Sequence, residues 1–132
     1  MRVIDRDLDA LTCDACQDDP TRVRRVAKLL PSDENFERAS WLLKAIADPV
    51  RAKILFALSC EPLYVCELAT MLDMTMSAVS HHLKVMMMAG ILKARKDGKF
   101  VCYYFSVESQ AKMLAGLVFA LTQPQTSPPQ PF

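Results

Sequence analysis

The stretch that decides the fold is residues 65–106, which read VCELATMLDMTMSAVSHHLKVMMMAGILKARKDGKFVCYYFS. Two runs in it have apolar residues at helical spacing, Val65–Leu72 and Met76–Ala89, and a tight turn at Asp73-Met74 separates them. Thr75 stands where it can cap the second run. Two helices joined by so short a turn predict a helix-turn-helix.

After Gly90, which ends the second helix, the apolar residues change from helical spacing to alternation. Ile91–Lys96 and Lys99–Ser106 predict two strands, and Asp97-Gly98 between them is a strong signal for a two-residue hairpin turn. The second strand places three apolar residues on one face: Val101, Tyr103 and Phe105.

Helices are predicted on both sides of this stretch, over Phe36–Ala47, over Pro49–Ser59 with Asp48 as its cap, and over Val107–Thr122. The last helix has an apolar stripe that we expect to be the seam of a dimer: Ala111, Leu114, Ala115, Val118 and Leu121. The order helix, helix, helix-turn-helix, hairpin, helix predicts a mostly α fold with a β-hairpin wing (α+β). This is a winged helix-turn-helix, which we expect to be homodimeric.

Composition divides the chain into three parts. Residues 1–31 are polar and charged, contain Cys13 and Cys16, and predict an arm with some helix at Arg22–Leu30. Residues 32–122 form the winged helix-turn-helix domain for DNA binding and dimerisation. Residues 123–132 are mostly Gln, Pro, Ser and Thr, which predicts a disordered tail.

Length and composition exclude several classes of protein. A chain of 132 residues with 52% hydrophobic residues has room for one domain with a core. No apolar run approaches the roughly 18 residues of a membrane span, and the acidic N-terminal residues lack the apolar segment of an export signal. The 3 glycines include none in a phosphate-binding motif. We therefore expect a cytoplasmic protein without a membrane partner, whose 5 cysteines are reduced thiols.

Charge is distributed unevenly along the chain, although the formal net charge is only +1. Residues 1–38 hold seven basic and nine acidic side chains, whereas residues 75–132 hold six basic and two acidic ones. A basic second half is compatible with a nucleic-acid surface there.

Three segments together resemble the signature of the ArsR/SmtB family of metal-responsive repressors: ADPVRAKIL at residues 47–55, VCELA at residues 65–69 and SAVSHHLK at residues 77–84. The likeness covers roughly residues 36–121. It implies a transcriptional repressor, not an enzyme, that binds a pseudo-palindromic operator in double-stranded DNA as a homodimer.

The second helix of the helix-turn-helix has a polar face whose residues follow each other at i, i+3, i+4 and i+7: Ser77, Ser80, His81 and Lys84. Serine and histidine can bond base edges, and lysine can neutralise a phosphate. The resemblance implies that Ser77, Ser80 and His81 contact DNA, and that the wing cations Arg95 and Lys99 reach an adjacent groove or the backbone. Neither histidine is expected to bind metal, and His82 is expected to pack against the wing or the Pro49–Ser59 helix.

Three cysteines are the candidate metal ligands. By itself Cys13-x-x-Cys16 is half a zinc site, a redox pair or two idle thiols. In the cadmium- and lead-sensing branch of the family, cysteines of an N-terminal arm join cysteines at the start of the first helix of the helix-turn-helix. The resemblance therefore implies a thiolate site of Cys13, Cys16 and Cys66.

This sequence departs from that branch at one position, where Tyr64 replaces the first cysteine of the branch's Cys-x-Cys. Three thiolates suit Pb(II), As(III), Sb(III) or Bi(III), and they hold Cd(II) or Zn(II) when Asp14, water or the Tyr64 oxygen completes a tetrahedron. Zn(II) is the less favoured inducer. The family's second zinc site, on the last helix, is absent because that helix contains no histidine.

Two further cysteines have no assigned role. Cys60 is expected to be a small buried hydrophobic residue, and Cys102 to be half exposed in the second strand of the wing. A thiol redox or persulfide sensor of the same fold, using Cys13 with Cys16 or Cys60 with Cys102, remains an alternative function. A small thiol enzyme is disfavoured, because no anion-binding loop surrounds any cysteine.

Overall fold

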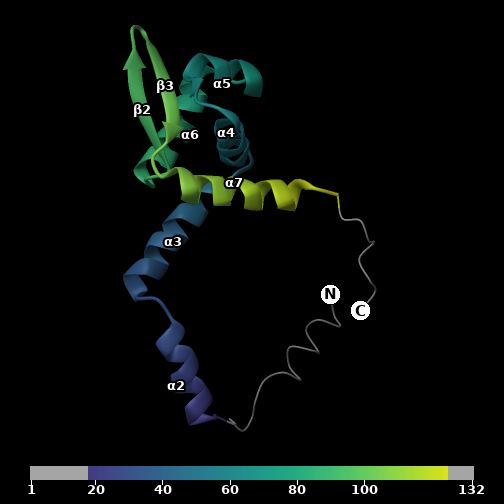
Figure 1. Cartoon of the computed structure of the whole chain (residues 1–132). Helices are drawn as coiled ribbons and strands as arrows, with labels where there is room; N and C mark the ends of the chain where they lie inside the picture. Colours follow the sequence, from purple (N-terminus) through teal and green to yellow (C-terminus); the bar gives the residue numbers. More distant parts are fainter. Residues whose placement is uncertain (1–17, 125–132) are drawn as a thin grey trace. The chain divides into compact units, whose positions relative to one another are not determined.

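The computed structural model describes residues 18–124 (Figure 1). The predicted metal ligands Cys13 and Cys16, and most of the predicted tail, lie outside these residues. The chain divides into two compact units, Met1–Asp33 and Glu34–Phe132.

In the first unit the structure describes helix α2, Pro20–Leu29, which begins two residues before the predicted Arg22. Asp19 caps it by accepting hydrogen bonds from the amides of Thr21 and Arg22, and Pro20 occupies a first-turn position where its missing N–H costs nothing.

The second unit has the predicted order of elements. Its helices are α3 (Asp33–Ile46), α4 (Pro49–Cys60), α5 (Val65–Leu72), α6 (Met76–Met88) and α7 (Glu108–Thr122). Its strands are β1 (Leu63–Tyr64), β2 (Leu92–Asp97) and β3 (Phe100–Phe105). The predicted winged helix-turn-helix fold is therefore confirmed. No helix of the described part of the chain is long and apolar enough to cross a bilayer.

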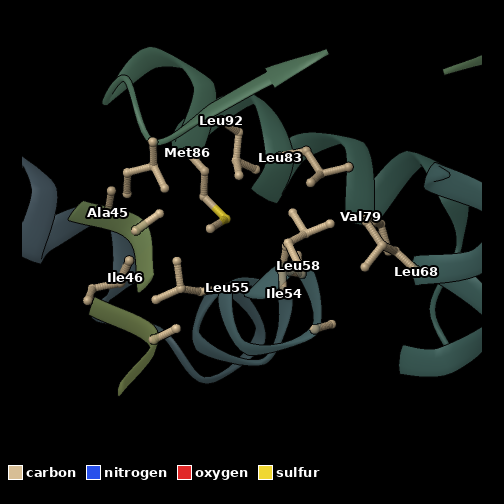
Figure 2. Packing of buried hydrophobic residues seen from close by; sticks show 14 of the residues in the cluster. Ala45, Ile46, Ile54, Leu55, Leu58, Leu68, Val79, Leu83, Met86 and Leu92 are labelled. Carbon is tan, nitrogen blue, oxygen red and sulfur yellow. The ribbon is translucent and has the colours of Figure 1, made fainter. Parts of the chain in front are cut away.

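Helix α4 lies at the centre of this unit. Its cap is Asp48, whose carboxylate accepts from the amides of Val50 and Arg51, as the Asp-Pro sequence predicts. Its inward face buries the three predicted residues, Ile54, Leu55 and Leu58. Helices α6 and α7 and strand β3 pack against α4, and Figure 2 shows the Met86 side chain pointing into the middle of the cluster of buried residues.

The strands form an antiparallel sheet in the order β1-β3-β2. Strand β1 was not predicted, because two residues are too few to show an alternation in the sequence. The hairpin turn lies one residue later than predicted: Asp97 pairs with Phe100, so the loop is Gly98-Lys99. Gly98 has φ +64° and so supplies the positive φ that the first loop position of a type II′ turn requires.

The predicted dimer seam on α7 is wrong for Ala111 and Ala115, which the chain's own core buries. Ala111 and Ala115 are buried, and Leu114 and Val118 pack against the core of their own chain. Helix α4 needs an apolar neighbour on this side, and alanines let α7 approach it closely. The exposed large apolar residues of α7 are Leu121, which was predicted for the seam, and Met113, Leu117 and Phe119, which were not.

Candidate nucleic-acid interface and thiol site

Helix α6 has two chemically different faces. Val79, Leu83 and Met86 are fully buried against the core, which confirms the predicted inward face. The four predicted DNA-contacting residues of this helix are all exposed: Ser77, Ser80, His81 and Lys84. Short hydroxyl groups and an imidazole therefore face solvent together, where a base edge can reach them.

The turn before α6 fixes where this polar face begins. Asp73 follows the last residue of α5 as its cap with a left-handed φ of 52°, and the amide of Met74 donates to the carbonyl of Ala69. Thr75 then caps α6, since its hydroxyl accepts from the amide of Ala78 at 3.1 Å, as predicted. These local bonds set the angle between the two helices.

The hairpin β2–β3 carries the cations of the wing. Arg95 and Lys99 are exposed, as are Lys93 and Lys96. The guanidinium of Arg95 lies 5.9 Å from the ring centroid of Tyr104, so an aromatic face supports it. Lys99 stands in the two-residue loop at the tip. This basic edge can neutralise phosphates.

Tyr64 joins the wing to the start of α5. Its hydroxyl donates to a carboxylate oxygen of Asp97 at 2.7 Å, and its ring tilts against Phe100 with centroids 5.7 Å apart. The hydrogen bond to Asp97 raises the pKa of Tyr64 above its ordinary value. The tyrosine oxygen, considered above as a fourth metal ligand, is thus a protonated donor to the wing. Nothing in the sequence signalled this contact, because its partners are 33 positions apart.

His82 turns away from His81 and toward α4, which is one of the two positions predicted for it. Its Nδ1 lies 3.4 Å from Nη1 of Arg51 and 3.8 Å from a carboxylate oxygen of Asp48. The amide of Arg51 donates to the Asp48 carboxylate, and this bond together with the charge of the Arg51 guanidinium lowers the pKa of Asp48.

The structure describes three of the five cysteines, all as free thiols. Cys66 lies in the first turn of α5 and is partly exposed. Two predictions are wrong. Cys60 is exposed, because it is the last residue of α4 and lies beyond the buried stripe. Cys102 is buried, because it lies in the central strand with Tyr64 and Arg95 beside it in register.

Within residues 18–124 no three His, Cys, Asp or Glu side chains form a cluster that could hold a metal ion. A metal site at Cys66 therefore needs ligands from outside these residues or from a second copy of the chain. An apolar groove of about 1010 Å³ lies between α4, α5 and α7, with Cys60 among its lining residues and the stacked rings of Phe56 and Phe119 in its wall.

Comparison with known proteins decides the family. Residues 48–94 match the model of the bacterial regulatory protein, arsR family. The chain is also 35% identical, over 99 residues, to a cadmium resistance transcriptional regulatory protein, a CadC homolog, of Staphylococcus aureus; the match covers 74% of this chain and 80% of the relative. The chain belongs to the arsR family.

Solved structures agree with this assignment. The chain resembles HlyU of Vibrio cholerae with a TM-score of 0.64 and 33% identity, over 70% of this chain and 100% of that one. It shares the fold of a homodimeric winged helix-turn-helix DNA-binding domain of Mycobacterium bovis, with a TM-score of 0.62 and 24% identity, over 69% of this chain and 87% of that one. This arsR-family chain is a transcriptional regulator, as the resemblance implied, and its relatives are regulators rather than enzymes.

Proposed function

We propose that this arsR-family regulator represses transcription by binding operator DNA as a homodimer, and that a thiophilic metal or metalloid ion releases it. The observation that carries the proposal is the division of α6 into a buried apolar face and an exposed polar face. A helix with this division, held by a cap and a short turn, is suited to lie in a major groove.

The contacts to DNA are assigned to six residues of α6 and the wing. Ser77, Ser80 and His81 read base edges from the first turns of α6, and Lys84, one turn further on, meets the phosphate backbone. Arg95 and Lys99 reach the neighbouring groove or backbone from the hairpin. A homodimer then places two copies of α6 and the hairpin on half-sites about 34 Å apart in a pseudo-palindrome.

Dimerisation is supported by apolar side chains that the folded chain leaves exposed. On α7 these include Met113 and Leu117, and on α3 they include Phe36 and Leu43, which are 46% and 48% exposed. Side chains of this size on helices beside a small core indicate a protein interface. A second copy of the chain is the occupant that a two-fold DNA site requires.

The inducer site is assigned to Cys13, Cys16 and Cys66. Cys66 is partly exposed at the beginning of α5, the helix that precedes α6. An ion held there would therefore change how α5 and α6 are oriented relative to each other. Metal and operator would then weaken each other's binding by one coupling free energy, commonly about 1–3 kcal/mol. A site of three thiolates suits Pb(II), As(III) or Sb(III), and it holds Cd(II) or Zn(II) when another ligand completes a tetrahedron. A cadmium resistance regulator among the relatives fits this choice.

An ultraviolet titration of the reduced, metal-free protein with each ion tests the inducer. A saturable thiolate-to-metal absorption band is expected, and it should disappear in Cys66→Ser and weaken when operator is bound. Cys60→Ser is the matched control, because it removes another accessible thiol of the same domain and should leave the band unchanged. If no ion gives a band and thiols are lost after mild oxidation, the thiol redox alternative replaces metal sensing.

Operator binding is tested separately, on duplexes selected from random sequence by the wild-type chain. Ser80→Ala and His81→Ala should each lower affinity by about 5-fold to 150-fold, since a good base contact contributes about 1–3 kcal/mol. Both variants should unfold like the wild type, because both residues are exposed. Unchanged affinity in both variants would contradict the assignment of α6 to base reading.

A further inference from the structure

Three helices meet around the side chain of Arg51. Its Nε donates to the carbonyl of Ala45 near the end of α3 at 2.6 Å, and its Nη1 lies 3.4 Å from Nδ1 of His82 on α6. Its own amide, in the first turn of α4, donates to Asp48 at 3.1 Å. One side chain thus joins the end of α3, the start of α4 and the middle of α6.

The chemistry of these groups defines the bond between Arg51 and His82. A guanidinium carries only donors, so the Nδ1 that faces it must accept, and the ring proton of neutral His82 belongs on Nε2. Asp48 lies 3.8 Å from the same Nδ1 and stays ionised, because the Arg51 amide holds its pKa low. The Asp48 carboxylate, which caps α4, therefore also offsets the positive charge of the Arg51 guanidinium next to α6.

His81 and His82 face different surroundings, because adjacent residues of a helix point about 100° apart. His81 is exposed beside Ser80 on the polar face, whereas the side chain of His82 is only 19% exposed and faces α4. The core positions α6 through the close packing of its buried apolar face. The bond from Arg51 to His82 adds a directional constraint next to the base-reading residues.

We propose that His82 is a positioning residue for operator recognition: by accepting a hydrogen bond from Arg51, it fixes the rotation of α6 against α3 and α4 and so aligns the polar face with the bases. The inference rests on the proposed operator binding by α6. It predicts a loss of sequence discrimination rather than a general loss of DNA affinity, because phosphate contacts tolerate a misaligned helix and base contacts do not.

The test compares three variants of the full chain on two duplexes. His82→Leu removes the acceptor, His82→Asn keeps a carbonyl oxygen as far from Cβ as Nδ1 is, and His82→Gln moves that oxygen one bond further out. The duplexes are an operator selected from random sequence by the wild type and a scrambled duplex of the same length and base composition. Thermal unfolding followed by circular dichroism confirms that each variant is folded.

The expected result is a selective loss. His82→Leu should lower affinity for the selected duplex about tenfold and change affinity for the scrambled duplex less than about twofold, given the usual strength of a hydrogen bond to a charged group. His82→Asn should restore most of the discrimination and His82→Gln less. In a double-mutant cycle, His82→Leu should cost little further discrimination in an Arg51→Met background, since the bond to His82 is already absent there, although Arg51→Met also removes the bond to Ala45.

Three results would overturn the inference: an equal loss on both duplexes, no loss on either, or an Asn variant that discriminates no better than the Gln variant. If His82→Leu does not fold, the Asn and Gln variants carry the test. The proposed function fails separately, when the wild type selects no duplex at all or when Ser80→Ala and His81→Ala leave the affinity unchanged.

Discussion

Helices α6 and α7 both pack one face against the core, but their outward faces differ in polarity. Each packs one stripe against the core around α4: Val79, Leu83 and Met86 from α6, and Ala111 and Ala115 from α7. The outward face of α6 is polar, with serines, a histidine and a lysine. The outward face of α7 is apolar, with Met113, Leu117 and Leu121 among its exposed residues.

The difference agrees with the partners proposed for the two helices. A helix that will lie in a groove of DNA needs donors and acceptors on its outward face, and water satisfies them until DNA arrives. A helix that will be covered by another protein surface gains from apolar residues there, although they are unfavourable while they face water. Four predictions break or sharpen this contrast, from the largest expected effect to the smallest.

Leu83→Ala should lower the free energy of unfolding by about 2–5 kcal/mol, because Leu83 is fully buried and its removal leaves a cavity. The neighbouring change Lys84→Ala should stay within about 0.5 kcal/mol, since Lys84 is exposed. Urea unfolding at one protein concentration measures both. A similar destabilisation in the two variants would contradict the two-faced description of α6.

The double change Met113→Lys, Leu117→Lys should raise the dissociation constant of the proposed homodimer by about 100-fold or more, because two exposed apolar side chains worth about 1.5–3 kcal/mol each would no longer bury favourably. Sedimentation over a dilution series measures it. Gln110→Lys, an exposed polar position on the same helix, is the matched control and should dimerise normally. A dimer unaffected by the double change would place the partner on another surface.

Thr75→Ala should destabilise the domain by about 1 kcal/mol, since it leaves the amide of Ala78 without its cap. Thr75→Ser keeps the hydroxyl and should restore nearly all of this. Helix α7 offers no equivalent target, because its cap residue Val107 makes no side-chain cap hydrogen bond. Equal loss in the Ala and Ser variants would show that the methyl group, rather than the cap bond, stabilises this turn.

Asp48→Asn should change the pH dependence of stability. The folded-state pKa of Asp48 lies below its ordinary value, so its ionised form stabilises the fold above about pH 4 and this contribution disappears as the pH falls through the lowered pKa. Asparagine caps a helix about as well but has no charge to lose. Thermal unfolding between about pH 5.5 and 3 should therefore show the wild type losing its advantage over Asn on acidification. A constant difference across that interval would assign the effect to shape rather than charge.

Most elements between α4 and the hairpin β2–β3 were predictable because local signals determine them. Asp48-Pro49, Thr75 and Gly90 mark helix ends by backbone chemistry that acts within a few residues. The inward residues of α6 followed from spacing alone. The assignment of Cys60 and Cys102 failed because burial of a cysteine depends on what packs over it, and a single sequence contains no such information.

The sequence by itself determined the order of elements, the inward face of α4 and α6, the exposed polar set on α6 and the family. Only the tertiary structure decided which side of α7 faces the core, that Tyr64 reaches Asp97 across the sheet, and that Arg51 joins His82 to α3. The reason is physical: caps and periodicity act over one or two turns, whereas these contacts join residues that only the packed core brings together.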